Sequence, residues 1–230
     1  MKVSIVAKTV PAGILEGTQI DDIVDFVAYC ARVSNPGNQM NTETSENLIK
    51  YLIRNKHWSP LEMADIVVEI QTTRDIGRQF LRHSSIKIQE FSQRYQDVNE
   101  LSGGEDMFEW SECRLQDNKN RQNSLPTIDK ELMQWWMNNQ RDVARHAEKV
   151  YNEAIAKGIA KEVARKVLPE GLTKSRLYAK GSIRSWIHYL EARGEGTGTQ
   201  KEHELLANEI ALCISEIFDI KKFKSVNAKN

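Results

Sequence analysis

The segment of residues 73–95 constrains the fold more than any other stretch, because its charged, hydroxyl and apolar residues recur in a regular order. Its cationic side chains are Arg74, Arg78, Arg82, Lys87 and Arg94. The apolar residues between them allow one side to pack while the other side faces a ligand. Guanidinium groups match phosphate oxygens in two-point geometry, so this mixture suits an anionic ligand. The alternative, favoured by composition alone, is a solvated amphipathic helix followed by an ordinary strand.

Periodicity predicts the local structure around this segment. Apolar and polar residues alternate in residues 64–72, which predicts a strand. Residues 73–81 have helical spacing, and residues 86–95 again tend to alternate. We therefore expect a helix–loop–strand corner, which exposes backbone N–H groups as well as side chains and so suits phosphate binding.

The rest of the chain predicts further strands and several long helices. A strand is expected at residues 1–10, a strand or extended loop at 172–181, and helices at 20–33, 44–55, 128–156, 159–168 and 183–193. Thr199 and Glu202 have the spacing of a capping box that opens the last helix. Residues 101–124 are polar and are expected to form a mobile surface loop or short helices. We expect one mixed α/β domain over residues 1–220, followed by a polar tail that frays over residues 221–230.

The charge and cysteine content exclude several broad classes. Lys plus Arg equals Asp plus Glu in the 230 residues, whereas nucleic-acid-binding proteins usually carry a basic excess. The three cysteines are far apart and form no C-x-x-C pair, which indicates a reducing compartment without a disulfide framework. No segment resembles a signal peptide or approaches membrane-spanning length. We therefore expect a soluble cytoplasmic protein with neither a nucleic-acid nor a membrane partner.

The histidines do not indicate a metal site. Five histidines are present, and none belongs to an H-E-x-x-H motif or another metal-ligand spacing. A metal hydrolase is therefore disfavoured, and no metal is predicted.

The order of residues inside the first segment resembles a known signature. Arg82 and His83 are followed by Ser92, and then by Arg94 and Tyr95. This resembles the R-H-R-x7-S signature of the flavin-dependent thymidylate synthases, together with its downstream S-x-R-Y. The third signature position departs from the family, because Ser84 stands where arginine is usual.

Further motifs resemble the same family in the same order along the chain. His57, Ser59, Pro60 and Glu62 match the family's H-x-S-P-F-E-H element, with Leu61 and Met63 at the positions usually held by Phe and His. Arg165 lies in an A-R-x-x-L-P context. Arg184, Ser185, His188 and Arg193 match the helix that begins N-x-R-S, with Ser182 in the place of its asparagine if no gap is allowed; Gly181 or Lys180 is equivalent otherwise. Gln200 and Glu202 resemble the family's A-Q-x-E.

The resemblance implies a fold and an assembly. It implies a mixed α/β subunit with an antiparallel or mixed sheet and long helices. It also implies a homotetramer whose active sites are each built from several subunits.

The resemblance likewise implies an activity. The family methylates dUMP to dTMP, with 5,10-methylenetetrahydrofolate as the carbon donor, FAD as the cofactor and NADPH as the reductant. No cysteine stands in the matching motifs, so an enzymatic thiol nucleophile is not expected.

Residue roles follow position by position from the resemblance. The dUMP-binding set is Gln79, Arg82, Glu90, Phe91, Ser92, Gln93, Arg94, Arg165 and Arg193. The FAD-contacting set is His57, Ser59, Arg82, His83, Ser84, Glu90, Ser182, Ile183, Arg184 and His188. Arg193 is the catalytic candidate, because a cation beside the pyrimidine favours ionisation of the ring imide. Ser84 removes one positive charge, for which the nearby Lys87 can compensate.

Two alternatives remain beside this interpretation. Ser84 is the reason to consider a relative that acts on a different pyrimidine nucleotide. The second alternative is a nucleic-acid-binding α/β module that uses the face of Arg74–Arg94. Zero net charge and the absence of stacked aromatic residues near those arginines disfavour the module.

Overall fold

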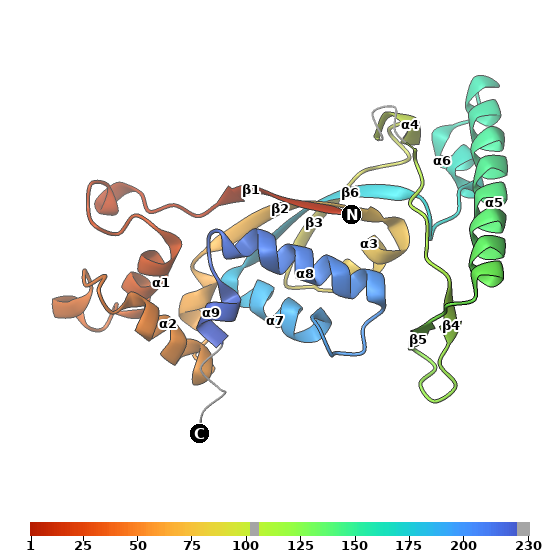
Figure 1. Cartoon of the computed structure of the whole chain (residues 1–230). Helices are drawn as coiled ribbons and strands as arrows, with labels where there is room; N and C mark the ends of the chain where they lie inside the picture. The colour runs from red at the N-terminus through yellow and green to blue at the C-terminus, as the bar shows by residue number, and fades with distance from the viewer. Residues whose placement is uncertain (102–105, 225–230) are drawn as a thin grey trace.

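Four antiparallel strands form the central sheet of the computed structural model, which describes residues 1–101 and 106–224 (Figure 1). The strands are β1 (Lys2–Lys8), β2 (Asp65–Thr73), β3 (Lys87–Glu90) and β6 (Lys174–Ser182). Their order across the sheet is β1–β2–β6–β3, and every neighbouring pair is antiparallel. The predicted mixed α/β fold with an antiparallel sheet is confirmed.

The pairing of β2 with β6 decides which side chains enter the core. Its register runs without a shift from Asp65 opposite Ser182 to Thr73 opposite Lys174. Side chains alternate between the two faces of a strand, so the fully buried Ile66, Val68 and Ile70 all point to one face.

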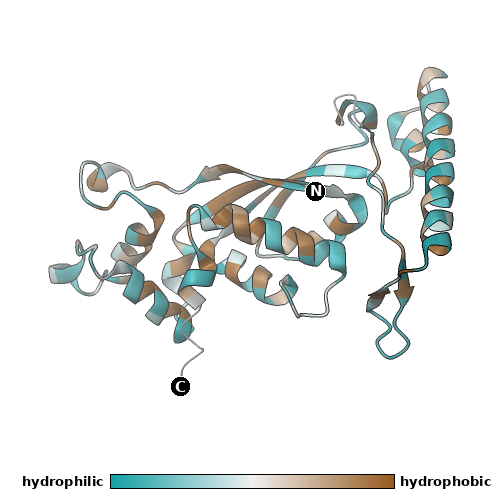
Figure 2. Cartoon of the chain, in the orientation of Figure 1, coloured by the Kyte–Doolittle hydropathy of each residue, from teal (hydrophilic) through white to brown (hydrophobic). Residues whose placement is uncertain are grey.

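Helices cover this buried face. They are α3 (Arg74–Phe80), α7 (Ile183–Arg193), α8 (Lys201–Ser215) and α9 (Ile220–Lys224), with α1 (Ile23–Ala31) and α2 (Ser45–Arg54) at one end. Figure 1 shows α7 and α8 lying side by side across the sheet. Figure 2 shows apolar residues alternating with hydrophilic ones along both helices, as expected for elements with one buried side. Single-turn 3₁₀ helices are η1 (Gly13–Leu15), η2 (Pro36–Asn38), η3 (Ser59–Glu62) and η4 (Arg165–Val167).

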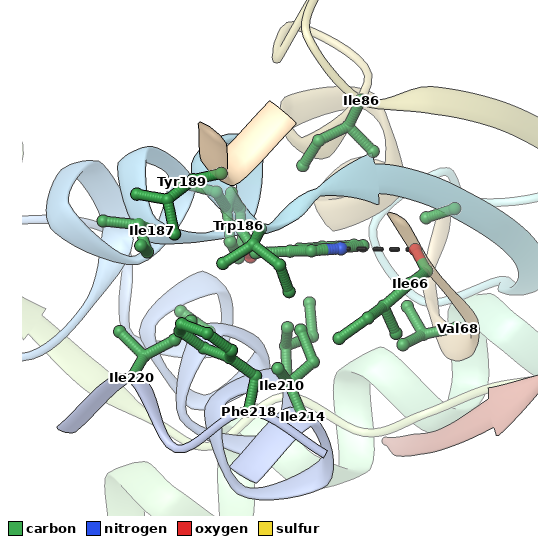
Figure 3. Packing of buried hydrophobic residues seen from close by; sticks show 14 of the residues in the cluster. Ile66, Val68, Ile86, Trp186, Ile187, Tyr189, Ile210, Ile214, Phe218 and Ile220 are labelled. Atoms are coloured by element: carbon green, nitrogen blue, oxygen red, sulfur yellow. Dashed lines mark hydrogen bonds between the residues drawn. The ribbon is translucent and has the colours of Figure 1, made fainter. Parts of the chain in front are cut away.

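Trp186 fills the centre of the main core. Its side chain is fully buried, and its indole Nε1–H donates to the backbone carbonyl of Ile66 at 3.3 Å. Figure 3 shows the ring among Ile66, Ile210 and Ile214, which come from the sheet and from α8. A Cβ on Gly181 would lie 3.2 Å from the indole, so glycine allows β6 to approach the ring closely.

A second, smaller core lies beside the long helix α5 (Lys130–Ala156). Figure 1 shows α5, α6 (Lys161–Ala164) and α4 (Val98–Leu101) set apart from α7 and α8. The buried residues of this core are Val98, Met107, Phe108, Ala144, Tyr151 and Ala164. The Tyr151 hydroxyl donates to Asp97 at 3.0 Å and accepts from the Val98 backbone at 3.2 Å, which ties α4 to α5.

Two sequence-based expectations are wrong. The polar region 101–124 contains strand β4 (Arg114–Gln116), which pairs with β5 (Ser124–Pro126); residues 102–105 lie outside the described part. Three-residue strands are too short to show alternation, and side-chain bonds such as Arg114 to Ser124 at 2.8 Å support the hairpin. The predicted capping box is also absent from the described start of α8. Its N-cap is Gln200, without a side-chain capping bond, and Thr199 instead bonds Thr197 at 2.9 Å.

The ends of two further predicted segments differ from the structure. Strand β3 ends at Glu90, so the continuation of the strand towards residue 95 is replaced by turns. Helix α9 covers the first residues of the predicted polar tail, and Phe223 within it is buried. Residues 225–230, where fraying was expected, lie outside the described residues. Within residues 1–101 and 106–224, no helix has both the length and the apolar character needed to cross a membrane.

We expect the Trp186→Ala substitution to lower the free energy of unfolding by about 3–5 kcal/mol, because it leaves a large cavity in the core. Chemical denaturation followed by circular dichroism measures this loss. Ile14→Ala is the control, since Ile14 is 87% exposed and its truncation should change stability by less than about 0.5 kcal/mol. Equal effects of the two substitutions would contradict the central role of Trp186.

Candidate active site

Arg193 and His83 meet although they are far apart in the sequence. Arg193 is the last residue of α7, and His83 lies in the turn that follows α3. The Arg193 Nε–H donates to His83 Nε2 at 3.1 Å. An imidazole that accepts at Nε2 carries its proton on Nδ1 and is neutral. Burial, followed by the positive charge of Arg193, lowers the pKa of His83, which favours this neutral form.

Aromatic and histidine rings surround this pair. Tyr189 meets the His83 ring edge-on with centroids 4.9 Å apart, and its ring lies 5.9 Å from that of His203. Burial, with the charge of Arg193 as a smaller cause, lowers the pKa of His203 to about 4. Burial raises the pKa of Tyr189. The side of Arg193 that faces these three rings is therefore lined by neutral groups.

Two polar atoms of this ring cluster have no hydrogen-bond partner among the residues that the structure describes. They are the hydroxyl of Tyr189 and the Nε2 of His203, and both are buried. The sequence motifs indicate a role for neither residue. Each occupies an apolar position of a helix, where the pattern predicts only core packing.

Gln79 joins the same cluster from α3. Its Oε1 lies 3.3 Å from His203 Nδ1, and its Nε2 donates to Gln200 Oε1 at 2.7 Å. Thus Gln79 and His83, both from the segment of residues 73–95, converge with Arg193 from the end of α7. Gln200 was matched to a family motif without a predicted role.

Glu90 lies in a network of charges rather than at an open surface. Its carboxylate accepts from Arg78 at 3.1 Å, from Arg74 at 3.4 Å and from the Ser175 hydroxyl at 2.9 Å. Glu170 accepts from both arginines, at 3.1 and 3.2 Å. Burial raises the pKa of Glu170, but the bonds from Arg74 and Arg78 outweigh it and hold the pKa below its usual value. The network clamps α3 to β3 and to the start of β6, and nothing in the sequence pattern indicated Glu170.

A third group forms where η3 meets the start of α7. Glu62 accepts from the Ser182 hydroxyl at 2.6 Å and from Arg184 at 2.9 Å. Ser182 also caps α7, because its hydroxyl accepts from the Ser185 backbone at 3.2 Å. Ser182 and Ile183 are both buried, so Ser182 in the place of the family's asparagine serves an internal contact.

The two predicted histidines next to this group pack on aromatic rings. His188 meets Trp58 edge-on with centroids 4.7 Å apart, and His57 meets Tyr51 in the same way at 5.7 Å. Ser59 and His57 are exposed. Near the junction of η3 and α7, exposed or half-buried polar side chains therefore pack on the rings of Trp58 and Tyr51.

The turn after β3 carries the remaining predicted residues towards the second core. The Phe91 backbone N–H donates to the Arg176 carbonyl at 2.8 Å, and exposed Arg94 pairs with Glu162 of α6 at 3.0 Å. Ser92 is exposed, whereas Gln93 is buried and its Nε2 has no partner within the described residues. Arg165 is half-buried in η4, directly after α6.

The loop between α3 and β3 carries hydrogen-bond donors that no carboxylate of the described residues occupies. Arg82 and Ser84 are exposed, and Arg82 makes no ion pair within the described residues. Lys87 Nζ donates to the Ser84 backbone carbonyl at 3.1 Å. Its positive charge therefore lies beside Ser84, the position where the family signature has arginine. A cavity of about 290 Å³ lined by Lys2, Gln71, Lys174 and Arg176 does not include any predicted site residue. The donor set of the loop itself therefore fits an anionic group such as a phosphate.

Three carboxylates elsewhere lie close enough to share a cation. They belong to Asp21, Asp22 and Asp25 at the start of α1. Asp22 caps this helix by accepting from the Asp25 backbone at 2.8 Å, and a helix N-terminus favours negative charge. The cluster is thus accounted for by the helix that it begins.

Comparisons with known proteins agree with these motifs. The family described as thymidylate synthase complementing protein matches residues 18–218. A protein named probable flavin-dependent thymidylate synthase, from Paramecium bursaria Chlorella virus 1, is 44% identical over 98% of this chain and 97% of its own length. A flavin-dependent thymidylate synthase from Synechocystis sp. is 45% identical over 99% of this chain and 98% of its own length.

A solved structure shares the fold. The UMP/dUMP methylase PolB from Streptomyces cacaoi, bound with 5-Br dUMP, superposes with a TM-score of 0.76. The match covers 94% of this chain and 90% of that chain at 24% sequence identity. Together with the convergence of Gln79, His83 and Arg193, these matches show that the chain belongs to the flavin-dependent thymidylate synthase family of methyltransferases.

Proposed function

We propose that the chain methylates dUMP to dTMP, with FAD as cofactor, 5,10-methylenetetrahydrofolate as carbon donor and NADPH as reductant. The observation that carries this proposal is the bond between Arg193 and His83, which joins two separate family motifs. Family membership at 44–45% identity over nearly the whole chain supports the same reaction. PolB, which has the same fold, is a UMP/dUMP methylase bound with 5-Br dUMP, which supports a pyrimidine nucleotide as the substrate class.

Arg193 is proposed to act on the pyrimidine ring. A neutral imidazole partner leaves the full positive charge of the guanidinium available, whereas a carboxylate partner would offset it. A cation held beside the ring imide stabilises the imide anion and so raises electron density at the carbon to be methylated. Cys30, Cys113 and Cys213 are free thiols outside the motifs, so no thiol attack is required.

The other dUMP contacts are proposed from exposed and half-buried polar side chains. Arg82, Ser92, Arg94 and Arg165 would bind the nucleotide with Gln79. Arg94 must then exchange its exposed partner Glu162 for the phosphate, which costs little because surface ion pairs are weak. Phe91 and Gln93 are proposed to shape the turn that carries Ser92 and Arg94. Glu90 is proposed to support the nucleotide site by holding β3 against α3.

The FAD contacts are proposed at the loop after α3 and at the η3–α7 junction. Arg82, Ser84, Ser59, His57 and His188 offer exposed or half-exposed polar groups. His83 and Arg184 lie in the same two regions, while Ser182, Ile183 and Glu90 support them from inside. The flavin supplies the hydride when it is bound, and these residues hold and orient it. Lys87 beside Ser84 supplies positive charge where the family's arginine is missing.

An alternative within the family is action on another pyrimidine nucleotide. Ser84 motivates it, and the name UMP/dUMP methylase of a protein with the same fold gives it a concrete form. Turnover of dUMP compared with that of UMP and dCMP, under one set of conditions, discriminates the two. Preferential turnover of UMP or dCMP would replace dUMP in the proposal.

We expect the purified protein, incubated with FAD and desalted, to retain a two-band flavin absorption spectrum that NADPH bleaches under argon. Lys87→Ala should weaken FAD retention, because it removes the charge that compensates for Ser84. The exposed Lys149 on α5 provides a matched control as Lys149→Ala. A folded protein that takes up no FAD at excess cofactor would overturn the cofactor assignment.

We expect Arg193→Ala to retain FAD and to lose about 100- to 1,000-fold in methylation rate, as for removal of a group that stabilises developing charge. Single-turnover conversion of dUMP measures the rate, and absorbance measures the bound flavin. Arg54→Ala, at the exposed end of α2, should leave both unchanged. Wild-type methylation by the Arg193 variant would remove this residue from the mechanism.

We propose that four copies assemble and share their active sites, because the predicted residues lie in separate open groups. Helix α5 and η4 line a groove of about 550 Å³ with Val143, Ala147, Val150 and Val167, and Val143 is 59% exposed.

Light scattering should give four times the 26.4 kDa chain mass, and Val143→Asp should shift the measured mass to smaller species. A wild-type monomer with full activity would contradict shared sites.

A further inference from the structure

A continuous row of hydrogen bonds runs from the β4–β5 hairpin to the buried end of the candidate site. Arg114 donates to Glu202 at 2.6 Å, and Gln200 Nε2 donates to the other Glu202 oxygen at 3.0 Å. Gln79 Nε2 donates to Gln200 Oε1 at 2.7 Å. Gln79 Oε1 then lies 3.3 Å from His203 Nδ1. The row crosses from β4 to α8 and α3 and returns to α8.

The chemistry of its first two members gives this row one direction. An arginine can only donate and an ionised carboxylate can only accept, so Gln200 must turn its NH₂ towards Glu202. The Gln200 oxygen is then left for Gln79, which must present its NH₂ there and its own oxygen to His203. The orientations of both amides therefore follow from the fixed donor Arg114 and the fixed acceptor Glu202. They do not depend on telling the oxygen and nitrogen atoms of each amide apart directly.

We propose that Glu202, held by Arg114, is a positioning residue that sets the amide orientation of Gln79 and places the proton of His203 on Nδ1. Because Gln79 Oε1 can only accept, His203 Nδ1 must donate to it. Burial raises the pKa of Glu202, but its bonds from Gln200 and Arg114 outweigh this and lower the pKa, so the carboxylate stays ionised.

The buried surroundings of His203 agree with this tautomer. With the proton on Nδ1, the unpartnered Nε2 carries only an acceptor lone pair. Buried acceptors without a partner are more common in proteins than buried N–H groups without one. The Tyr189 ring lies 5.9 Å from the His203 ring, and its buried hydroxyl also lacks a partner within the described residues. The opposite tautomer would leave a buried N–H without a partner among the described residues.

The consequence for the nucleotide rests on the proposed function. Gln79 has one further N–H and one further lone pair to offer beyond its bonds to Gln200 and His203. Reversing its amide would exchange the donor and the acceptor that a ligand meets. Glu202 would thus act on dUMP recognition through Gln79, without touching the nucleotide.

The test is ¹⁵N NMR of protein labelled in its histidine rings, where protonated and unprotonated ring nitrogens have well separated shifts. The His203 signal is assigned by its loss in His203→Gln. In Glu202→Gln, Arg114 retains the new carbonyl oxygen, so the new NH₂ faces Gln200. Gln200 and then Gln79 must reverse, and the proton of His203 is expected to move from Nδ1 to Nε2.

Glu112→Gln is the matched control. Glu112 accepts from Arg114 at 2.7 Å and from Lys201 at 2.6 Å and has no hydrogen bond to Gln200 within residues 1–101 and 106–224, so its substitution should leave the proton on Nδ1. A proton on Nε2 in the unmodified protein overturns the proposal without any variant. An unchanged tautomer in folded Glu202→Gln overturns it as well.

Calorimetric titration with dUMP separates this proposal from the proposed function. We expect the dissociation constant to rise about tenfold in Glu202→Gln and to stay unchanged in Glu112→Gln. An inverted tautomer with unaltered dUMP affinity supports the positioning role of Glu202 and removes Gln79 from the nucleotide site. An unchanged tautomer with normal dUMP binding overturns the positioning role and leaves the proposed function standing.

Discussion

The antiparallel pairing of β2 with β6 is the constraint on which the rest of the structure depends. Each of these strands leads directly into a helix, β2 into α3 and β6 into α7. Antiparallel pairing places the start of one strand beside the end of the other. The Arg74 backbone therefore donates to the Thr173 carbonyl at 2.9 Å, and the Ile183 backbone donates to the Ala64 carbonyl at 3.0 Å.

This geometry explains two polar clusters that are remote in sequence. Helix α7 begins beside the entry to β2, which brings Ser182 and Arg184 to Glu62. Helix α3 begins beside the entry to β6, which brings Arg74 and Arg78 to Glu170. The C-terminal sides of α3 and α7 then meet at His83 and Arg193.

The arginines of the site differ in their partners, and the partner decides what each can do. Arg74, Arg78 and Arg184 bond carboxylates, so their charges are largely used to hold elements together. Arg193 donates to an imidazole nitrogen of His83, so no carboxylate offsets its charge in this contact. A half-buried cation whose partner is a neutral group is costly in a protein interior, and the proposed function assigns this charge to the nucleotide.

The sequence by itself determined the strands of the main sheet, most helices and the motif residues, because alternation and helical spacing are local properties and Arg82, His83 and Ser92 stand in one short order. It also led to Arg193 and Gln79 through the family resemblance. Short strands such as β4 fell below the length at which alternation is visible.

Only the tertiary structure decided which charges are paired. Glu170, Tyr189, His203 and the row that ends at Arg114 come from distant segments, so no local pattern indicates them. The same holds for Ser182, whose hydroxyl lies against Glu62 and not in an open site. Hydrogen bonds and ion pairs depend on distances that the packing of strands and helices sets, and the order of residues alone does not contain those distances.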